Sequence, residues 1–100
     1  MRKTNESFIN IVAIKRHRLE ALEKAYRIIT EMTKSETESL RYYQEELDKT
    51  IDTFRIDNPD KTEEEVEANY KYDFRNEEIE ELTIKIMGYK QALDAIEKLA

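Results

Sequence analysis

The sequence predicts an all-α protein built as one long antiparallel helical hairpin. Apolar residues recur at alternating spacings of three and four along most of the chain, which is the period of packed helices. The chain has 100 residues, of which 40% are charged, with one glycine and one proline, a composition typical of long solvated helices. The proline, Pro59, stands near the middle and marks the place where the chain turns back.

The first helix is expected over residues 5–56. Its apolar seam keeps one phase across the polar stretch 33–39, which favours a continuous helix. Ser35 with Glu38 also makes a capping box, so a kink or a break at 33–39 stays open. The seam consists of Val12, Leu19, Leu22, Tyr26, Ile29, Leu40, Tyr43, Leu47 and Phe54, with Lys15, Thr33, Glu36 and Thr50 as polar members.

A turn is expected over 57–61 and a second helix over 62–99. Thr62 with Glu65 forms a capping box that restarts the helix after Pro59. The first turns run in a shifted phase, which predicts a kink near 74–79. The seam of this helix consists of Ile79, Leu82, Ile86, Tyr89, Leu93 and Ile96, preceded in the shifted phase by Val66, Tyr70 and Phe74.

Folding the chain at Asn58 sets residue i opposite residue 116 − i. Leu19 then meets the region of Ile96, and Leu22 meets Leu93. The two irregular stretches, 33–39 and 74–79, fall at one height along the rod, which suggests a joint there. A three- or four-helix bundle is the alternative architecture.

Each helix carries a second apolar stripe near the end that holds both termini, which we call the foot (residues 1–32 and 84–100). An apolar face wider than one seam needs more than one partner helix, so we expect homo-oligomerisation through the foot. Small residues in both stripes would allow close helix contact. The stripes are Ile11, Ile14, Arg18, Ala21, Ala25, Ile28 and Met32 in the first helix, and Ile84, Gly88, Ala92, Ala95 and Leu99 in the second.

Charge is distributed unevenly along the chain. Residues 1–34 carry a net charge of +4, residues 35–81 carry −11, and residues 82–100 carry +1. We call the acidic stretch 35–81 the head. The overall charge of −6 disfavours nucleic-acid binding. The chain has no cysteine, which excludes disulfides and thiolate zinc sites and fits a cytoplasmic protein, or one of a host cytoplasm if a virus encodes it. We expect no membrane span, no metal and no cofactor.

The head combines acidic residues with aromatic ones. Aromatic anchors surrounded by carboxylates suit a partner protein with a basic surface, because tyrosine supplies buried area and the acids steer the approach. We therefore expect a partner-binding, non-enzymatic protein, in the manner of an inhibitor or an assembly factor. A solvated charged rod is the alternative. The candidate residues are Tyr42, Tyr72, Phe74, Glu45 and Asp48.

A basic cluster in the foot provides another candidate site. Lys15, Arg16 and Arg18 lie near the expected interface, where several protomers would hold an anionic nucleotide between them. The protein would then sequester nucleotides, as phage anti-defence proteins of this kind do. Pairing with Asp94 and Glu97 of the same chain is the alternative for these cations. The single histidine, His17, has no nearby nucleophile and is expected to be a surface residue.

Two acidic pairs suggest an enzyme as a further alternative. Glu20 and Glu23, followed by Glu45 and Asp48, form the spacing E-x-x-E … E-x-x-D. This spacing resembles the signature of all-α nucleotide pyrophosphohydrolases, a resemblance that implies four carboxylates holding magnesium against a nucleotide's phosphates. If residues 5–56 form one helix, however, Glu20 and Glu45 are separated by roughly 37 Å at ~1.5 Å per residue.

Overall fold

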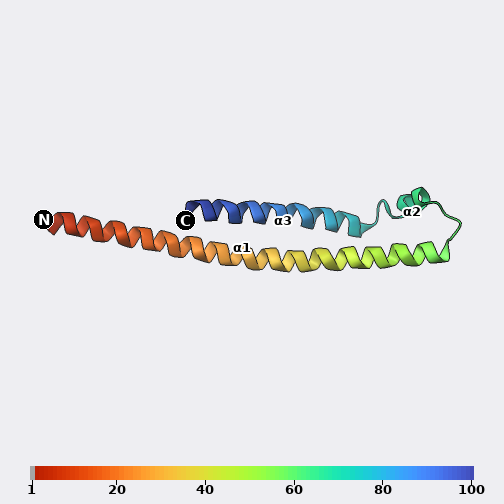
Figure 1. Ribbon diagram of the computed structural model, residues 1–100, viewed down its shortest axis with the longest axis horizontal. Helices are drawn as coiled ribbons and strands as arrows, with labels where there is room; N and C mark the ends of the chain where they lie inside the picture. Colours follow the sequence, from red (N-terminus) through yellow and green to blue (C-terminus); the bar gives the residue numbers. More distant parts are fainter. Residues whose placement is uncertain (1) are drawn as a thin grey trace.

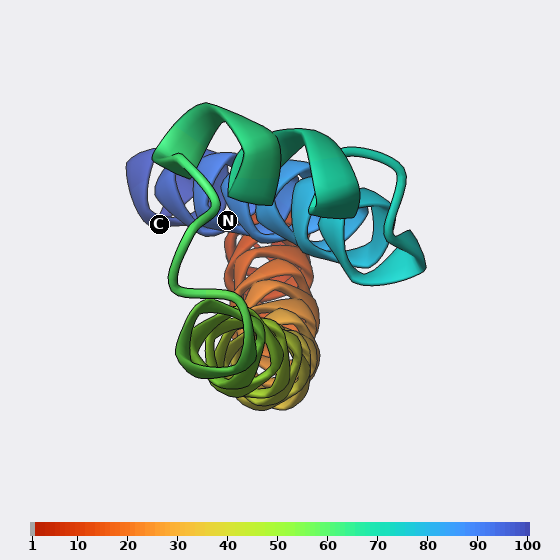
Figure 2. The same ribbon diagram turned by 90° about the vertical axis from the view of Figure 1, so that its right-hand side faces the viewer.

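The computed structural model describes residues 2–100, with side chains from residue 10 onward, as an elongated helical hairpin (Figure 1). The helices are α1 (Arg2–Asp57), α2 (Glu63–Tyr70) and α3 (Phe74–Leu99). The rod measures 87 × 17 × 16 Å. α1 forms one arm and α3 forms the antiparallel second arm, while the short helix α2 lies across the end of the rod between them (Figures 1 and 2). The all-α hairpin predicted from the apolar period is therefore confirmed.

The long helix α1 continues through residues 33–39, where the sequence left a kink or a break open. Two of the polar side chains in this stretch form hydrogen bonds to their own helix. The hydroxyls of Thr33 and Thr37 donate to the carbonyl oxygens four residues earlier, at 2.7 Å each. Such bonds are compatible with a helix and only bend it slightly, so the polar stretch does not interrupt α1.

The turn between the arms is formed by residues that cannot continue a helix. The backbone N–H and the side-chain amide of Asn58 both donate to the carbonyl oxygen of Phe54, at 2.9 and 3.0 Å, and Pro59 follows. Thr62 then caps α2 by accepting the backbone N–H of Glu65 at 3.3 Å, as its capping-box spacing predicts.

The helix predicted over 62–99 is interrupted at residues 71–73, just before the stretch where the sequence predicts a kink. α2 ends at Tyr70, whose ring meets that of Phe54 edge-on at 5.5 Å between centroids. Asp73 begins α3 by accepting the backbone N–H of Arg75 at 2.9 Å. The shift in apolar phase therefore corresponds to two separate helices, with a cap between them.

The core of the hairpin is a single seam between the arms. The seam residues of α1 from Leu22 to Phe54 are buried or half-buried, and so are those of α3 from Ile79 to Ile96. Four apolar side chains, Leu47, Val66, Leu82 and Ile86, form its most buried part. Burial along the predicted seam confirms the apolar pattern as the element that joins the two helices.

The register between the arms differs from the expected one. Tyr26 was expected opposite Lys90, but it bonds to Glu97, seven residues farther along α3. The difference arises because the arm that pairs with α1 starts only at Phe74, after the crosswise helix α2 (Figure 2) and after residues 71–73, which lie outside the helices.

The shifted register changes the arrangement of the two termini. The chain ends beside Leu22, and residues 2–18 of α1, which we call the overhang, project beyond the C-terminus (Figure 1). Every described side chain of the overhang, from Asn10 to Arg18, is exposed. The foot therefore consists of a two-helix part and a single-helix part, instead of two helix ends at one level.

Candidate functional site

Two exposed aromatic side chains of the head share one open hollow. Tyr42 on α1 is 60% exposed and Phe74 at the start of α3 is 64% exposed. The hollow has a volume of about 520 Å³ and is also bordered by Tyr43, Glu46 and Arg75. The arms thus bring together two of the aromatic residues that the sequence singled out, with a carboxylate and a guanidinium beside them.

The other head candidates do not border this hollow. Glu45 borders a neighbouring hollow together with Tyr42, Glu38 and Arg41. Asp48 is exposed on the next turn of α1. Tyr72 is 87% exposed in the segment between α2 and α3, with the Lys71 ammonium 5.6 Å from its ring centroid. Of the predicted set, the structure therefore brings Tyr42 and Phe74 to one hollow, with Glu45 next to Tyr42, whereas Asp48 and Tyr72 are exposed but border neither hollow.

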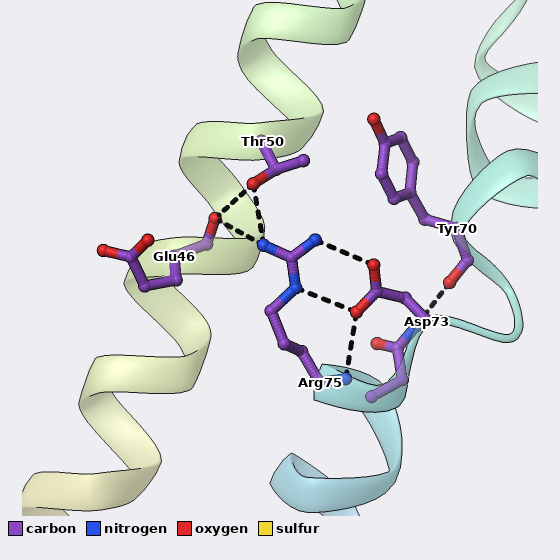
Figure 3. Close-up of polar contacts among 6 residues, drawn as sticks. Glu46, Thr50, Tyr70, Asp73 and Arg75 are labelled. Atoms are coloured by element: carbon purple, nitrogen blue, oxygen red, sulfur yellow. Dashed lines mark hydrogen bonds and ion pairs between the residues drawn. The ribbon is translucent and has the colours of Figure 1, made fainter.

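One wall of the hollow is fixed by Arg75, whose guanidinium joins the two arms (Figure 3). Its Nε and Nη2 donate to the two carboxylate oxygens of Asp73, both at 2.8 Å. Its Nη1 donates to the hydroxyl of Thr50 at 2.7 Å and to the carbonyl oxygen of Glu46 at 3.3 Å. We call these four residues the Arg75 clamp. The clamp sets the position of Phe74 against α1.

The Arg75 clamp is also the strongest electrostatic feature of the described residues. The side chains of Arg75 and Asp73 are only 16% and 15% exposed, and a bidentate pair of this kind is stronger than an ordinary surface ion pair. Hydrogen bonding from Arg75 lowers the pKa of the Asp73 carboxyl from 3.8 to about 2. The same pairing raises the pKa of Arg75. Both groups therefore stay charged over the whole neutral range.

Sequence reasoning missed this clamp, although one signal for it was present. Thr50 is a polar residue in an otherwise apolar seam, and a polar group at such a position needs a partner from the facing helix. The partner, Arg75, lies 25 residues away, so it becomes identifiable only once the register of the arms is known.

The basic cluster in the foot lies on the overhang. Lys15, Arg16 and Arg18 are exposed, and no salt bridge joins them to any side chain from residue 10 onward. The expected alternative partner Glu97 instead accepts a 2.8 Å hydrogen bond from the hydroxyl of Tyr26, which raises the pKa of that phenol. Nearby His17 is exposed, as expected of a surface residue.

The foot also contains an open apolar hollow where α3 ends against α1. It has a volume of about 340 Å³ and is lined by Leu19, Leu22, Glu23, Tyr26, Ile96, Glu97 and Ala100. Leu19 and Ile96 both border this hollow, but in the shifted register they do not lie opposite each other as expected. Leu19 remains 53% exposed because no helix covers α1 beyond this point.

The four carboxylates that resemble a pyrophosphohydrolase signature are not brought together within one chain. Glu20, Glu23, Glu45 and Asp48 all lie on the uninterrupted helix α1, so the two pairs stay roughly 37 Å apart. Among the described residues, no group of three or more histidine or acidic side chains is arranged to hold a metal ion.

Within residues 2–100, none of the helices combines the length and apolar character needed to cross a membrane. Comparisons with protein families, with characterised proteins and with solved structures find no match to this chain. Its function therefore has to be argued from the surfaces described above.

Proposed function

We propose that this protein is a non-enzymatic, homo-oligomeric helical protein of the cytoplasm that binds a macromolecule with a basic surface through its head. The observation that carries the proposal is the hollow that Tyr42 and Phe74, both more than half exposed, border together with Glu46 and Arg75. Large aromatic side chains that remain in water in the free protein are typical anchors of protein interfaces.

The charge of the head supports a basic partner rather than an acidic one. Residues 35–81 carry a net charge of −11. Among them, Glu38 and Glu45 border the neighbouring hollow on the other side of Tyr42, together with Arg41. A negative patch around apolar anchors accelerates association with a positive surface and disfavours acidic partners. The head therefore fits an inhibitor or an assembly factor that occupies the basic groove of another protein.

The Arg75 clamp makes this surface preorganised. Because Arg75 is bonded to Asp73 and to two groups of α1, the backbone that carries Phe74 is fixed relative to Tyr42 before any partner arrives. A rigid arrangement of anchors lowers the entropy that binding would otherwise cost.

The proposal can be tested with a synthetic peptide of alternating arginine and leucine, titrated by calorimetry. Replacing both Tyr42 and Phe74 by alanine is expected to weaken binding by roughly 30-fold or more, the loss typical of hot-spot anchors. Ile84→Ala removes an equally exposed apolar side chain outside the head and serves as the control. Helicity by circular dichroism should remain unchanged in all variants.

Two further results test whether the head binds a basic partner. A peptide in which glutamate replaces arginine is expected not to bind, and raising the salt concentration is expected to slow association with the basic peptide. Equal binding by the wild type and by the Tyr42→Ala, Phe74→Ala variant would refute the head as the binding surface.

A further inference from the structure

The hairpin exposes more surface than a compact protein of its size. Its accessible surface is 8514 Å², whereas a compact monomer of 12.0 kDa exposes about 6,000 Å². The excess of about 2,500 Å² per chain, or about 5,000 Å² for two chains, lies within the total area that obligate dimers bury. Apolar side chains contribute to this exposed surface, particularly along the foot.

The second apolar stripes of the two arms lie on the same side of the hairpin. In α1 and in α3 most stripe residues stand one position before a seam residue. In two antiparallel helices that face each other through their seams, residues at this position point to the same side of the pair. The burial of the side chains agrees with this placement, since one stripe residue of each helix, Ala25 and Ala92, is half-buried. The hollow in the head also agrees, because Tyr42 and Phe74 directly precede Tyr43 and Arg75 in the same way.

This common side forms one apolar face on the foot, which we call the foot face. Small residues at its centre allow another helix to approach closely, and larger apolar residues surround them. The face continues along the overhang, where α1 has no helix beside it (Figure 1). It consists of Ile11, Ile14, Ala21, Ala25, Ile28 and Met32 of α1 with Gly88, Ala92, Ala95 and Leu99 of α3.

Gly88 gives an independent indication that the foot face is covered. A glycine inside a helix is less favourable than alanine, so its presence calls for a close contact. Within this chain there is none, because a Cβ atom added at Gly88 would meet nothing within 4 Å. A close contact at Gly88 would therefore have to come from another molecule.

We propose that the foot face joins two copies of this chain in an antiparallel dimer, with the overhang of each copy lying along the body of the other. The charges select this orientation. In a parallel dimer the clusters formed by Lys15, Arg16 and Arg18 would lie side by side and repel each other. In the antiparallel dimer, with Ala21 and Ala25 near the two-fold axis, these cations lie toward Glu31 of the second copy and the start of its acidic stretch.

The antiparallel arrangement accounts for both unusual features of the foot. It covers the exposed apolar residues of the overhang, and it provides carboxylates for cations that are unpaired among the described side chains. A two-fold axis through the face gives a closed, self-complementary interface. This dimer gives a geometry to the homo-oligomer of the proposed function, and it does not depend on what the head binds.

The first test uses a matched pair of substitutions in the full chain. Met32 is 42% exposed on the foot face, and Met87 is 56% exposed on the opposite side of α3. Met32→Glu is expected to raise the dissociation constant of the dimer roughly tenfold or more in analytical ultracentrifugation, because it introduces a carboxylate into an apolar interface. Met87→Glu makes the same chemical change and is expected to leave the constant within about twofold.

The second test concerns the orientation. Arg18→Glu is expected to weaken the dimer, and adding Glu31→Arg should restore it, because the two positions are too far apart to pair within one α1 helix. The chain has no cysteine, so single cysteines can be introduced as reporters. Ala25→Cys is expected to form a disulfide-linked dimer, while Ile14→Cys is not, since the two Ile14 positions lie far apart in the antiparallel arrangement.

Clear outcomes would overturn the inference. A wild-type chain that sediments as a monomer at micromolar concentration, or a dimer that Met32→Glu leaves intact, would remove the foot face as an interface. Disulfide formation through Ile14→Cys would reverse the orientation. Loss of the dimer in the Tyr42→Ala, Phe74→Ala variant would move the interface to the head, whereas loss of peptide binding with the dimer intact would concern only the head.

Discussion

Replacing Asp73 by asparagine should destabilise the protein by an amount that depends on pH. Asparagine is as good an N-cap as aspartate, so the cap on α3 is retained while the charge opposite Arg75 is removed. The pKa of Asp73 is lowered from 3.8 to about 2 by the hydrogen bonds from Arg75. Such a shift corresponds to about 2 kcal/mol at most, and roughly 1 kcal/mol after allowance for contact with water.

The direction of the pH dependence follows from the lowered pKa. The stabilisation is fully present above the unfolded pKa of 3.8, and it is lost as the pH falls through the folded pKa of about 2. Urea unfolding of the wild type and of Asp73→Asn, followed by circular dichroism at a fixed chain concentration, measures the difference at each pH. The difference should be constant from pH 7 to 5, shrink below pH 4 and vanish near pH 2.

The comparison isolates the Arg75 clamp from the general effect of acid on a highly charged chain. Protonation of the other carboxylates affects both proteins alike and cancels in the difference. A difference that stays constant down to pH 2 would show that the substitution acts through packing or capping. No difference at neutral pH would refute the claim that the ion pair joins the two arms.

Three further outcomes are expected. Gly88→Ala should stabilise the single hairpin by about 0.5–1 kcal/mol, measured by thermal unfolding at concentrations where the dimer dissociates, because space is free around Gly88. The same substitution should weaken the dimer. A gain in the stability of both the hairpin and the dimer would contradict a close contact at Gly88. In an alkaline absorbance titration one tyrosine should ionise late, and Glu97→Gln should remove that late step, since Glu97 raises the pKa of Tyr26. Val66→Ala should cost about 2 kcal/mol, because Val66 is among the most buried side chains and holds α2 in place; an unchanged urea midpoint would contradict this role.

The sequence alone allows the two arms and their facing surfaces to be predicted. The seam from Leu22 to Phe54 is visible because the helical period is local, and each apolar residue can be recognised from its neighbours three and four positions away. Pro59 and Thr62 likewise define the turn through local backbone preferences. These features required no knowledge of which residues meet across the hairpin.

The register and the Arg75 clamp could not be predicted in the same way. A seam with a regular repeat packs almost equally well after a shift of seven residues, so the pairing of Tyr26 with Glu97 depends on the exact length of the turn and of the break at 71–73. The contact between Thr50 and Arg75 depends in turn on that register. The overhang is a consequence of the same shift. Without knowledge of the shift, both helix ends of the foot were expected at one level.

Because the rod is long, solvent ions screen its two charged ends from each other. At physiological ionic strength the field of a charge fades over about 8 Å, so the 87 Å axis corresponds to roughly ten screening lengths. A molecule approaching the acidic tip therefore experiences almost nothing of the lysines and arginines at the far tip. The two ends of one chain are therefore electrostatically independent, so pairing of the basic end with a second copy would leave the charge that a partner meets at the acidic end unchanged.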